Sequence, residues 1–370
     1  MKVLLLANAN SIHTKRWVIS LAQRGIKIYL FTLEKNKEPE YENNSKIKII
    51  ESSFINNTTN SGEISKASLL KYLPKLMKAI KVYKPDLVHA HYATSYGLLG
   101  ALCGFHPFVL SVWGSDIYDF PKISFIHKWM IKFNLSQADQ ILSTSHVMAI
   151  ETKKYTKKEI LVTPFGIDLT KFRDMQVDSD LPSNTIVIGT VKTLSSKYGI
   201  NFLIQAFKIV KERNPEIPLK LMIVGDGPEK KDLIEFCNKL SIENDVIFTG
   251  YVTHDKIPYY LNVLDIYIAL STLDSESFGV AIIEASACEK PVVVSNVGGL
   301  PEDVANGETG FIVERKDPID AANAIEKLVL NEKLRFSMGE AGRNMVEKYF
   351  NWEQNVNQMV NIYNKISQNN

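Results

Sequence analysis

Two glutamates enclose a short apolar stretch of this chain. Residues 276–284 read ESFGVAIIE, with Glu276 and Glu284 at the two ends. Helical character begins at residue 278, and the free amides that open a helix form an anion site. Gly279 lets a ligand approach the backbone closely. The chemistry fits a diphosphate at the helix start, with Glu276 on neighbouring hydroxyls and Glu284 on a pair of vicinal hydroxyls such as those of a ribose.

The same two carboxylates have a simpler explanation. Acidic residues are common near helix N-termini because they interact favourably with the helix dipole. Glu284 would then be one exposed side chain on a surface helix. From the residues alone, these two interpretations are equally good.

Buried apolar runs alternate with helical patterns along the whole chain. Strands are expected at residues 2–7, 26–32, 86–89, 108–112, 140–143, 185–191, 219–224, 246–249, 266–269, 291–294 and 311–313. Helices are expected at residues 14–24, 64–83, 123–137, 200–213, 230–240, 278–288 and 351–367. This alternation predicts parallel sheets with helices on both faces. The expected fold class is α/β, with two successive doubly wound domains.

The strand and helix pattern restarts after a polar, proline-containing segment near residues 163–184. We therefore expect an N-terminal domain of residues 1–170 and a C-terminal domain of residues 171–350. Residues 351–370 should form a helix that packs back on the first domain. Ligands of such sheets bind beyond the carboxyl ends of the strands, so an interdomain cleft is expected to collect the candidate residues.

The amino-acid composition and the charge distribution indicate which broad class of protein this is. About 45% of the 370 residues are apolar and 23% are charged, which is ordinary for a soluble globular protein. No apolar run approaches the roughly 18 residues of a membrane span, and three scattered cysteines indicate a reducing compartment. Residues 1–180 carry a charge of +8 and residues 181–370 a charge of −6. This split suggests different partners for the two halves.

The region around the two glutamates resembles the signature of a known family. Glu276, Glu284, the following EASACEKPVVVS and a Gly-Gly-Leu-Pro-Glu loop at 298–302 occur in the order typical of retaining glycosyltransferases of the GT-B fold, glycosyltransferase family 4. Further stretches match in order over nearly the whole chain: TPFGIDLTKF at 163–172, GDGP at 225–228 and FTGYV at 248–252. The resemblance implies transfer of a sugar from a nucleotide-diphosphate sugar to a hydroxyl group, with retention of configuration.

The resemblance also implies a donor site in the second half of the chain. Its expected residues are Glu276, Ser277, Phe278, Gly279, Val280, Glu284, Gly225 and Val252. Family members usually carry an Arg and, five residues later, a Lys just before the glycine of the 189–199 loop. Here these positions hold Thr193 and Tyr198, and Lys192 and Lys197 stand one residue earlier. We assign both lysines to the diphosphate, where lysine acts as a point charge without the fork of arginine.

The acceptor side is expected in the first half. Many members carry a Gly-Gly pair after the first strand, where this chain has Asn10 and Ser11, with His13 at the start of the next helix. His91 ends another strand and is the better cleft candidate of the two histidines there. Trp113 replaces a histidine that the family often carries, while Asp116 matches and is expected to hold an acceptor hydroxyl or the reacting sugar.

Bond breaking at an anomeric carbon leaves a negative phosphate that the protein must stabilise. The family suggests attack on the same face, with the leaving phosphate taking the proton of the acceptor. Glu276 would bind donor hydroxyls. No Asp-x-Asp pair lies in a convincing loop, so no metal is expected, and no cofactor beyond the donor as co-substrate.

The expected partners follow from the charge split and the resemblance. They are a UDP- or GDP-type sugar, a glycan or lipid-linked acceptor, and an anionic membrane surface contacted by basic helices at 65–84 and 121–133 of the first domain. No nucleic-acid-binding module is present. A hexosyltransferase in the cytoplasm, at the inner face of the membrane and serving capsule or lipopolysaccharide synthesis, is the resulting expectation.

Three alternatives stay open. A nucleotide-sugar 2-epimerase of the same architecture would need no acceptor, and the basic first half argues against it. A non-catalytic nucleotide-sugar-binding protein would not need both glutamates. A polysaccharide synthase of the glycogen type would be a longer chain.

Overall fold

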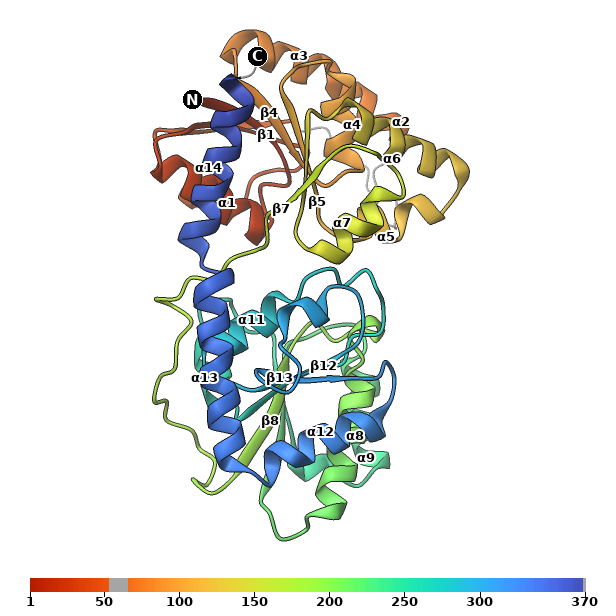
Figure 1. Cartoon of the computed structure of the whole chain (residues 1–370), viewed down its shortest axis with the longest axis vertical. Helices are drawn as coiled ribbons and strands as arrows, with labels where there is room; N and C mark the ends of the chain where they lie inside the picture. The colour runs from red at the N-terminus through yellow and green to blue at the C-terminus, as the bar shows by residue number, and fades with distance from the viewer. Residues whose placement is uncertain (53–65, 369–370) are drawn as a thin grey trace. The chain divides into compact units, whose positions relative to one another are not determined.

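The computed structural model describes residues 1–52 and 66–368 (Figure 1). By its backbone contacts the chain divides into two compact units, each with its own apolar core. The first unit consists of Met1–Pro164 and Gln354–Asn370, and the second of Phe165–Glu353.

The first unit is built on a parallel sheet of seven strands in the order β3-β2-β1-β4-β5-β6-β7. Its strands are β1 (Lys2–Leu6), β2 (Lys27–Thr32), β3 (Ile47–Glu51), β4 (Leu87–His91), β5 (Phe108–Val112), β6 (Gln140–Ser143) and β7 (Ile160–Val162). Its helices are α1 (Ile12–Gln23), α2 (Lys66–Leu69), α3 (Leu73–Tyr83), α4 (Ser95–Leu102), α5 (Ser115–Tyr118), α6 (Phe125–Gln137), α7 (His146–Lys153) and α14 (Trp352–Gln368). Short 3-10 helices cover Pro39–Tyr41, Leu70–Tyr72 and Phe120–Lys122.

The second unit repeats this plan with six parallel strands in the order β10-β9-β8-β11-β12-β13. Its strands are β8 (Ile186–Val191), β9 (Leu219–Val224), β10 (Val246–Gly250), β11 (Ile266–Ala269), β12 (Val292–Ser295) and β13 (Gly310–Val313). Its helices are α8 (Ile200–Arg213), α9 (Lys230–Lys239), α10 (Ile257–Val263), α11 (Val280–Ala287), α12 (Pro318–Val329) and α13 (Glu332–Tyr349). Short 3-10 helices cover Ser196–Tyr198, Glu243–Asp245 and Leu300–Asp303.

Burial explains why these segments form central strands. Four of the five residues of β1 and all five residues of β4 and β5 are buried. A parallel strand covered by helices on both faces needs such a continuous apolar run. The prediction of an α/β fold with doubly wound parallel sheets is confirmed, and each expected strand is present within two residues of its predicted ends. Two short strands, β3 and β7, were not predicted.

The helix expected at residues 64–83 is divided into α2, a 3-10 turn and α3. Its first two residues, 64 and 65, lie outside the described residues. Pro74 stands at the start of α3, in the first turn of a helix, where proline is best tolerated because an amide there has no helical partner.

Each sheet changes strand order at one place, between β1 and β4 in the first unit and between β8 and β11 in the second. At such a switch point the chain leaves neighbouring strands in opposite directions, which opens a crevice where ligands bind. The loops after these four strands are therefore the places to examine for a site.

The last helix, α14, belongs to the first unit, where Figure 1 shows it alongside α1. Arg24 Nε, just after α1, donates to Asn357 Oδ1 at 2.8 Å. The hydroxyl of Tyr363 lies 2.6 Å from His89 Nδ1 in β4, and Nε2 of that imidazole lies 2.8 Å from Ser111 Oγ in β5. Both His89 and Tyr363 are fully buried. These bonds connect the end of the chain to the centre of the first sheet.

Replacing Tyr363 with phenylalanine should lower the free energy of unfolding by about 1–3 kcal/mol, because His89 Nδ1 is left buried without a partner. Urea unfolding followed by circular dichroism measures this. Tyr349→Phe is the matched control, since Tyr349 is exposed. Equal midpoints for both variants would show that the buried bond contributes nothing.

Candidate functional site

The loop after β8 carries the two candidate lysines and is held from one side by the GDGP turn. Gly225 has φ +141°, and a Cβ on it would lie 2.0 Å from the carbonyl oxygen of Lys192. No side chain fits at that distance, so only glycine allows this close approach. The amide of Leu194 also donates to the carbonyl of Asp226 at 3.0 Å. The turn therefore fixes the position of Lys192.

The loop before α11 is fixed in the same way by the Gly-Gly loop after β12. A Cβ on Gly299 would lie 2.0 Å from the carbonyl oxygen of Ser277, and the Gly299 amide donates to the carbonyl of Glu276 at 2.9 Å. This backbone contact explains why the glycine pair follows the two-glutamate stretch. It holds Glu276 at the carboxyl edge of the second sheet.

Lys192 and Glu276 form a nearly buried ion pair, with Nζ 2.5 Å from Oε1. Burial lowers the pKa of Lys192, but the Glu276 carboxylate, together with Tyr267 and Tyr198, raises the pKa above its ordinary value. The ring of Tyr198 lies 4.7 Å from Lys192 Nζ and 4.5 Å from Lys197 Nζ. Both ammonium groups thus lie within cation–π distance of one aromatic ring, which attracts cations.

The start of α11 is already bonded within the unit. The amide of Gly279 donates to Oδ2 of Asp303 at 2.7 Å. Phe278 packs edge-on against Phe165 and Phe350, at 5.6 and 5.7 Å between ring centres. Burial raises the pKa of the Asp303 carboxyl to about 8. Asp303 was not predicted, although it directly follows the Gly-Gly-Leu-Pro-Glu loop of the resemblance.

Glu284 lies in α11, and 4% of the residue is exposed. Nε2 of His254 lies 2.8 Å from Glu284 Oε1, and Lys171 Nζ lies 3.3 Å from His254 Nδ1. Since a lysine ammonium and a carboxylate have opposite hydrogen-bonding capacities, Nδ1 accepts from Lys171 and Nε2–H donates to Glu284. The histidine therefore orients the carboxylate. His254 and Lys171 were missed, although both lie in or next to stretches quoted for the resemblance.

A hollow of about 200 Å³ opens between the loops after β8, β9 and β10. It brings together three predicted residues, Lys192, Gly225 and Val252, with Thr193, Asp226 and Tyr251. Tyr251 is 77% exposed and was not predicted. Ser277 is buried just before α11, and Val280 is its first residue. The predicted donor residues thus gather along one edge of the second sheet.

In the first unit, three predicted residues form an aromatic group at the switch point. The Trp113 ring lies 4.5 Å from the His91 ring and 6.0 Å from the His13 ring, between centres. His91 is 3% exposed, and its Nδ1 has no hydrogen-bond partner. Burial, together with the neighbouring imidazoles His89 and His13, holds the pKa of His91 well below its ordinary value. His91 is therefore neutral.

Asp116 lies in α5, after β5, and is fully buried. Its carboxylate accepts the backbone amides of Ala93 at 2.7 Å, Gly114 at 2.8 Å and Trp113 at 3.1 Å. Burial raises the pKa of this carboxyl, and these amide bonds oppose the rise. The side chain connects the loops after β4 and β5. This geometry favours a positioning role, and direct contact with a substrate stays a prediction.

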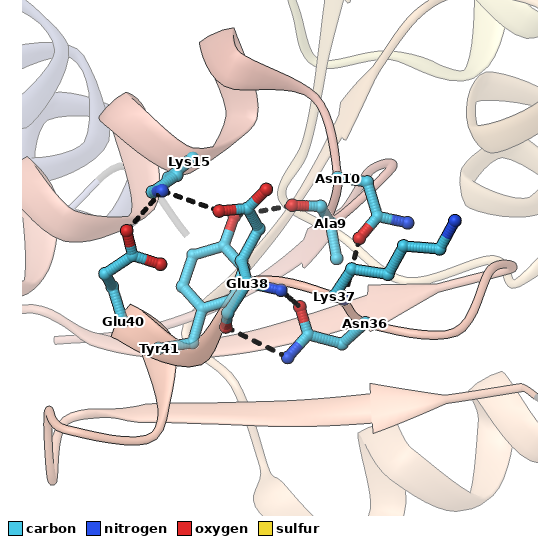
Figure 2. Close-up of polar contacts among 8 residues, drawn as sticks. All are labelled: Ala9, Asn10, Lys15, Asn36, Lys37, Glu38, Glu40 and Tyr41. Carbon is cyan, nitrogen blue, oxygen red and sulfur yellow. Dashed lines mark hydrogen bonds and ion pairs between the residues drawn. The ribbon is translucent and has the colours of Figure 1, made fainter. Parts of the chain in front are cut away.

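Asn10 lies in the loop after β1, and Figure 2 shows its side chain pointing toward the 36–41 segment. Its Oδ1 accepts the amide of Lys37 at 2.8 Å, and its Nδ2 donates to the carbonyl of Lys35 at 2.9 Å. Lys15 lies 2.6 Å from both Glu38 and Glu40 (Figure 2). The Asn10 amide is thus engaged inside the unit, while Ser11 occupies the N-cap position of α1.

The residues therefore form one group in each unit. Lys192, Lys197 and Glu276 lie close together with the other donor-side residues, and His13, His91 and Trp113 lie together on the acceptor side. Asp116 supports the second group through the Trp113 amide.

Family models match both units. One described as "Glycosyl transferase 4-like" matches residues 2–145, and one described as "Glycosyl transferases group 1" matches residues 171–345. N-acetyl-alpha-D-glucosaminyl L-malate synthase of Bacillus anthracis is 30% identical over 75% of this chain and 74% of its own. This chain is a GT-B glycosyltransferase of family 4.

Two further comparisons agree with this family. The capsular polysaccharide biosynthesis glycosyltransferase CapM of Staphylococcus aureus is 30% identical over 83% of this chain and 84% of its own. The structure of HepE from Anabaena in complex with UDP superposes with a TM-score of 0.80 at 20% identity, covering 99% of this chain and 100% of HepE. The GT-B fold of this glycosyltransferase is thus shared over its whole length.

Two kinds of feature are absent from the described residues. Within residues 1–52 and 66–368, no three or more His, Cys, Asp or Glu side chains are grouped so that they could hold a metal ion. Among the helices of those same residues, none is both long and apolar enough to cross a membrane.

Replacing Asp116 with alanine should lower the free energy of unfolding by about 3 kcal/mol or more, because two buried amides and one partly buried amide lose their acceptor. Thermal or urea unfolding measures this, and Asp119→Ala at an exposed neighbouring position is the control. A variant that keeps its stability and loses only activity would instead assign Asp116 to the substrate.

Proposed function

We propose that this glycosyltransferase is a retaining hexosyltransferase that moves a sugar from a nucleotide-diphosphate sugar to a hydroxyl of a glycan or lipid-linked acceptor. The observation that carries the proposal is the buried Lys192–Glu276 pair beside the start of α11. It puts a cation, a hydroxyl-binding carboxylate and the N-terminus of a helix at one switch point.

The diphosphate is proposed to lie at the N-terminus of α11, where the helix dipole favours negative charge. Lys192 has three N–H donors and gives one to Glu276. The other two can reach phosphate oxygens while the ion pair stays intact. A fixed ammonium in a nearly buried position stabilises the leaving phosphate strongly. With Lys192 and Lys197 supplying this charge, the proposed mechanism needs no divalent metal.

The transfer itself exchanges one C–O bond for another. The bond between the anomeric carbon and the phosphate oxygen breaks, and its electron pair goes to the phosphate. The acceptor oxygen forms the new bond on the same face, and its proton passes to the departing phosphate. Glu276 binds hydroxyls of the donor sugar throughout. Retention of configuration is supported by the resemblance of the two-glutamate stretch to retaining enzymes.

The nucleoside is proposed to occupy the hollow beside Tyr251 and Val252, with Glu284 on the ribose hydroxyls. Glu284 is held by His254 through one oxygen, which leaves the other for a hydroxyl. A UDP-type donor is supported by the UDP named for HepE. GDP is the second candidate, because nothing in the hollow discriminates between the bases.

Glu276→Gln should reduce transfer by about a hundredfold or more while UDP binding changes by less than about threefold, since the diphosphate contacts stay in place. Glu284→Ala should instead weaken UDP binding by about tenfold, since it removes the acceptor of the ribose hydroxyls. Saturation-transfer NMR against a panel of nucleotide-sugars identifies the donor, and sugar release measures turnover. Glu308→Gln, at an exposed turn, is the control.

The outcome also separates the alternative functions. Epimerisation of the sugar without any acceptor would identify a 2-epimerase. If Glu276→Gln only weakens binding and the unmodified protein never turns over, the chain is a nucleotide-sugar-binding protein. Failure of every nucleotide-sugar to bind the folded protein would contradict both the transferase and the binding-protein proposals.

An anionic membrane is the proposed partner of the first unit. Around the start of α6, four large apolar side chains are exposed beside three exposed lysines; this α6 surface consists of Ile123, Phe125, Ile126, Trp129, Lys122, Lys128 and Lys132. Phe125 is 82% exposed and Trp129 is 64% exposed. Exposed aromatic residues beside lysines suit the interface of an anionic bilayer.

The other basic segment, residues 66–83, differs from the α6 surface in having no exposed aromatic ring. Leu69 and Leu76 are completely buried, Lys71, Lys75 and Lys78 face solvent, and the exposed apolar side chains are Leu70, Met77 and Val82. A buried apolar face with charged residues outside is the ordinary pattern of a surface helix, and the side chain of Lys66 lies outside the described residues. The membrane proposal therefore rests on α6, and it fits a cytoplasmic enzyme that works on a lipid-linked surface glycan. The likeness to CapM supports capsule synthesis in particular.

The double change Phe125→Ser and Trp129→Ser should weaken binding to phosphatidylglycerol vesicles by about tenfold or more, because burial of each apolar side chain contributes roughly 1 kcal/mol or more. Vesicle sedimentation measures this, with phosphatidylcholine vesicles as the uncharged comparison. Phe336→Ser is the matched control, because Phe336 is 71% exposed in the second unit. Equal binding by all three proteins would contradict the proposal.

A further inference from the structure

Asp303 is a buried carboxyl group with one oxygen in use and one without a partner. It ends the 3-10 helix Leu300–Asp303 and is 2% exposed. Oδ2 accepts the Gly279 amide at the start of α11 at 2.7 Å. Oδ1 is buried and has no hydrogen-bond partner. Since buried polar atoms are nearly always paired in folded proteins, this atom requires an explanation.

Among the described residues, two carboxylates and one ammonium act on Asp303, and the ammonium is already paired. Lys192 is the nearby ammonium, and it is paired with Glu276 at 2.5 Å. Glu276, before α11, and Glu302, on the same 3-10 helix, are both negative groups that act on Asp303. An ionised Asp303 would thus add an unbalanced buried charge, which is costly. Burial together with these carboxylates raises the pKa of Asp303 to about 8.

We propose that Asp303 is a donor-binding residue that acts as a neutral carboxylic acid. Its carbonyl oxygen holds the Gly279 amide. Its hydroxyl, which is covered in this structure, is uncovered when the diphosphate binds at the start of α11 and donates a hydrogen bond to it. This inference rests on the proposed function, because it places the diphosphate at that helix end.

The chemistry of the ligand explains why a neutral acid suits this place. A diphosphate offers only acceptors, so a protonated oxygen can bond to it, whereas an ionised one repels it. The protonated side chain still accepts the Gly279 amide through its other oxygen. A carboxylic acid kept neutral by burial, so that it can donate, is a known device of active sites. Asp303 therefore links the affinity for the donor to pH.

The sign of that linkage follows from the raised pKa. Below about pH 8 the Asp303 side chain carries its proton and binds the diphosphate. Above that pH it ionises, and affinity is lost as the pH rises. If the ligand binds only the protonated form, one pH unit above the pKa reduces affinity by about tenfold.

Calorimetric titration of the full chain with UDP, and with GDP as a second probe, between pH 6.5 and 9 tests the proposal. We expect affinity for whichever nucleotide binds to fall by about tenfold between pH 7 and 9. Asp303→Asn should keep affinity at pH 7 within about threefold and remove this fall, because asparagine offers both a carbonyl for Gly279 and an N–H donor. Titration of the nucleotide itself affects both proteins equally.

Asp265→Asn is the matched control. Asp265 is also a largely buried carboxyl with a raised pKa, caused by burial, and it accepts the Val187 amide at 2.7 Å. It lies before β11, at the opposite end of the strands from the candidate site, so this variant should keep the pH dependence of the unmodified protein.

Three results would overturn the inference. One is constant affinity of the unmodified protein between pH 7 and 9, which does not depend on how well a variant folds. Another is an Asp303→Asn variant that retains the fall. The third is a loss of more than about tenfold in that variant at pH 7, which would identify an ionised Asp303 that accepts a sugar hydroxyl. Absence of any nucleotide binding would instead overturn the proposed function and this inference together.

Discussion

Backbone contacts too close for any side chain hold the candidate site together. A glycine at 225 lies against the carbonyl of Lys192, and another at 299 lies against the carbonyl of Ser277. Each contact fixes a loop that leaves the sheet at its switch point. Because these two fixed loops carry Lys192 and Glu276, the two side chains are held close enough to form their ion pair. The positions of Asp303 and the start of α11 depend on the same contacts.

The fold was predictable because its central strands are buried on both faces. Continuous apolar runs such as KVLLL and FVLSV admit few other structures, and their order gives the doubly wound plan. The two strands that were missed are the outermost strands of the first sheet, β3 and β7. In β3, a lysine interrupts the apolar residues, and β7 has only three residues. Edge strands carry a weaker pattern because one side lacks a neighbouring strand.

The candidate site was predictable in part for a related reason. Parallel strands end at a common edge, so the loops after β8 and β11, which carry Lys192 and Glu276, were expected at one site. Which side chains of other loops pair with these residues was not predicted. His254 reaches Glu284 from the loop after β10, and Asp303 reaches Gly279 from the loop after β12. Their positions follow from tertiary packing, which local sequence patterns do not encode.

The sequence also could not predict the direction in which individual side chains point. Asn10 lies in the expected loop, yet its amide turns toward residues 35–37, because that segment offers unpaired backbone groups. The offset lysines are a similar case. Lys192 and Lys197 stand one residue before the usual family positions, and the ammonium groups of both still lie close to the ring of Tyr198.

The first unit is formed by two distant segments of the chain, and this affects how the protein folds during synthesis. Its residues come from both ends of the chain, Met1–Pro164 and Gln354–Asn370, whereas the second unit is continuous. During synthesis, chains normally fold from the N-terminus onward. Here the buried hydrogen bond of His89 cannot form until Tyr363, which lies 274 residues later in the chain, has been made. The first unit is therefore begun first and finished last, because its seven-stranded sheet lacks α14 until residues 352–368 have been made.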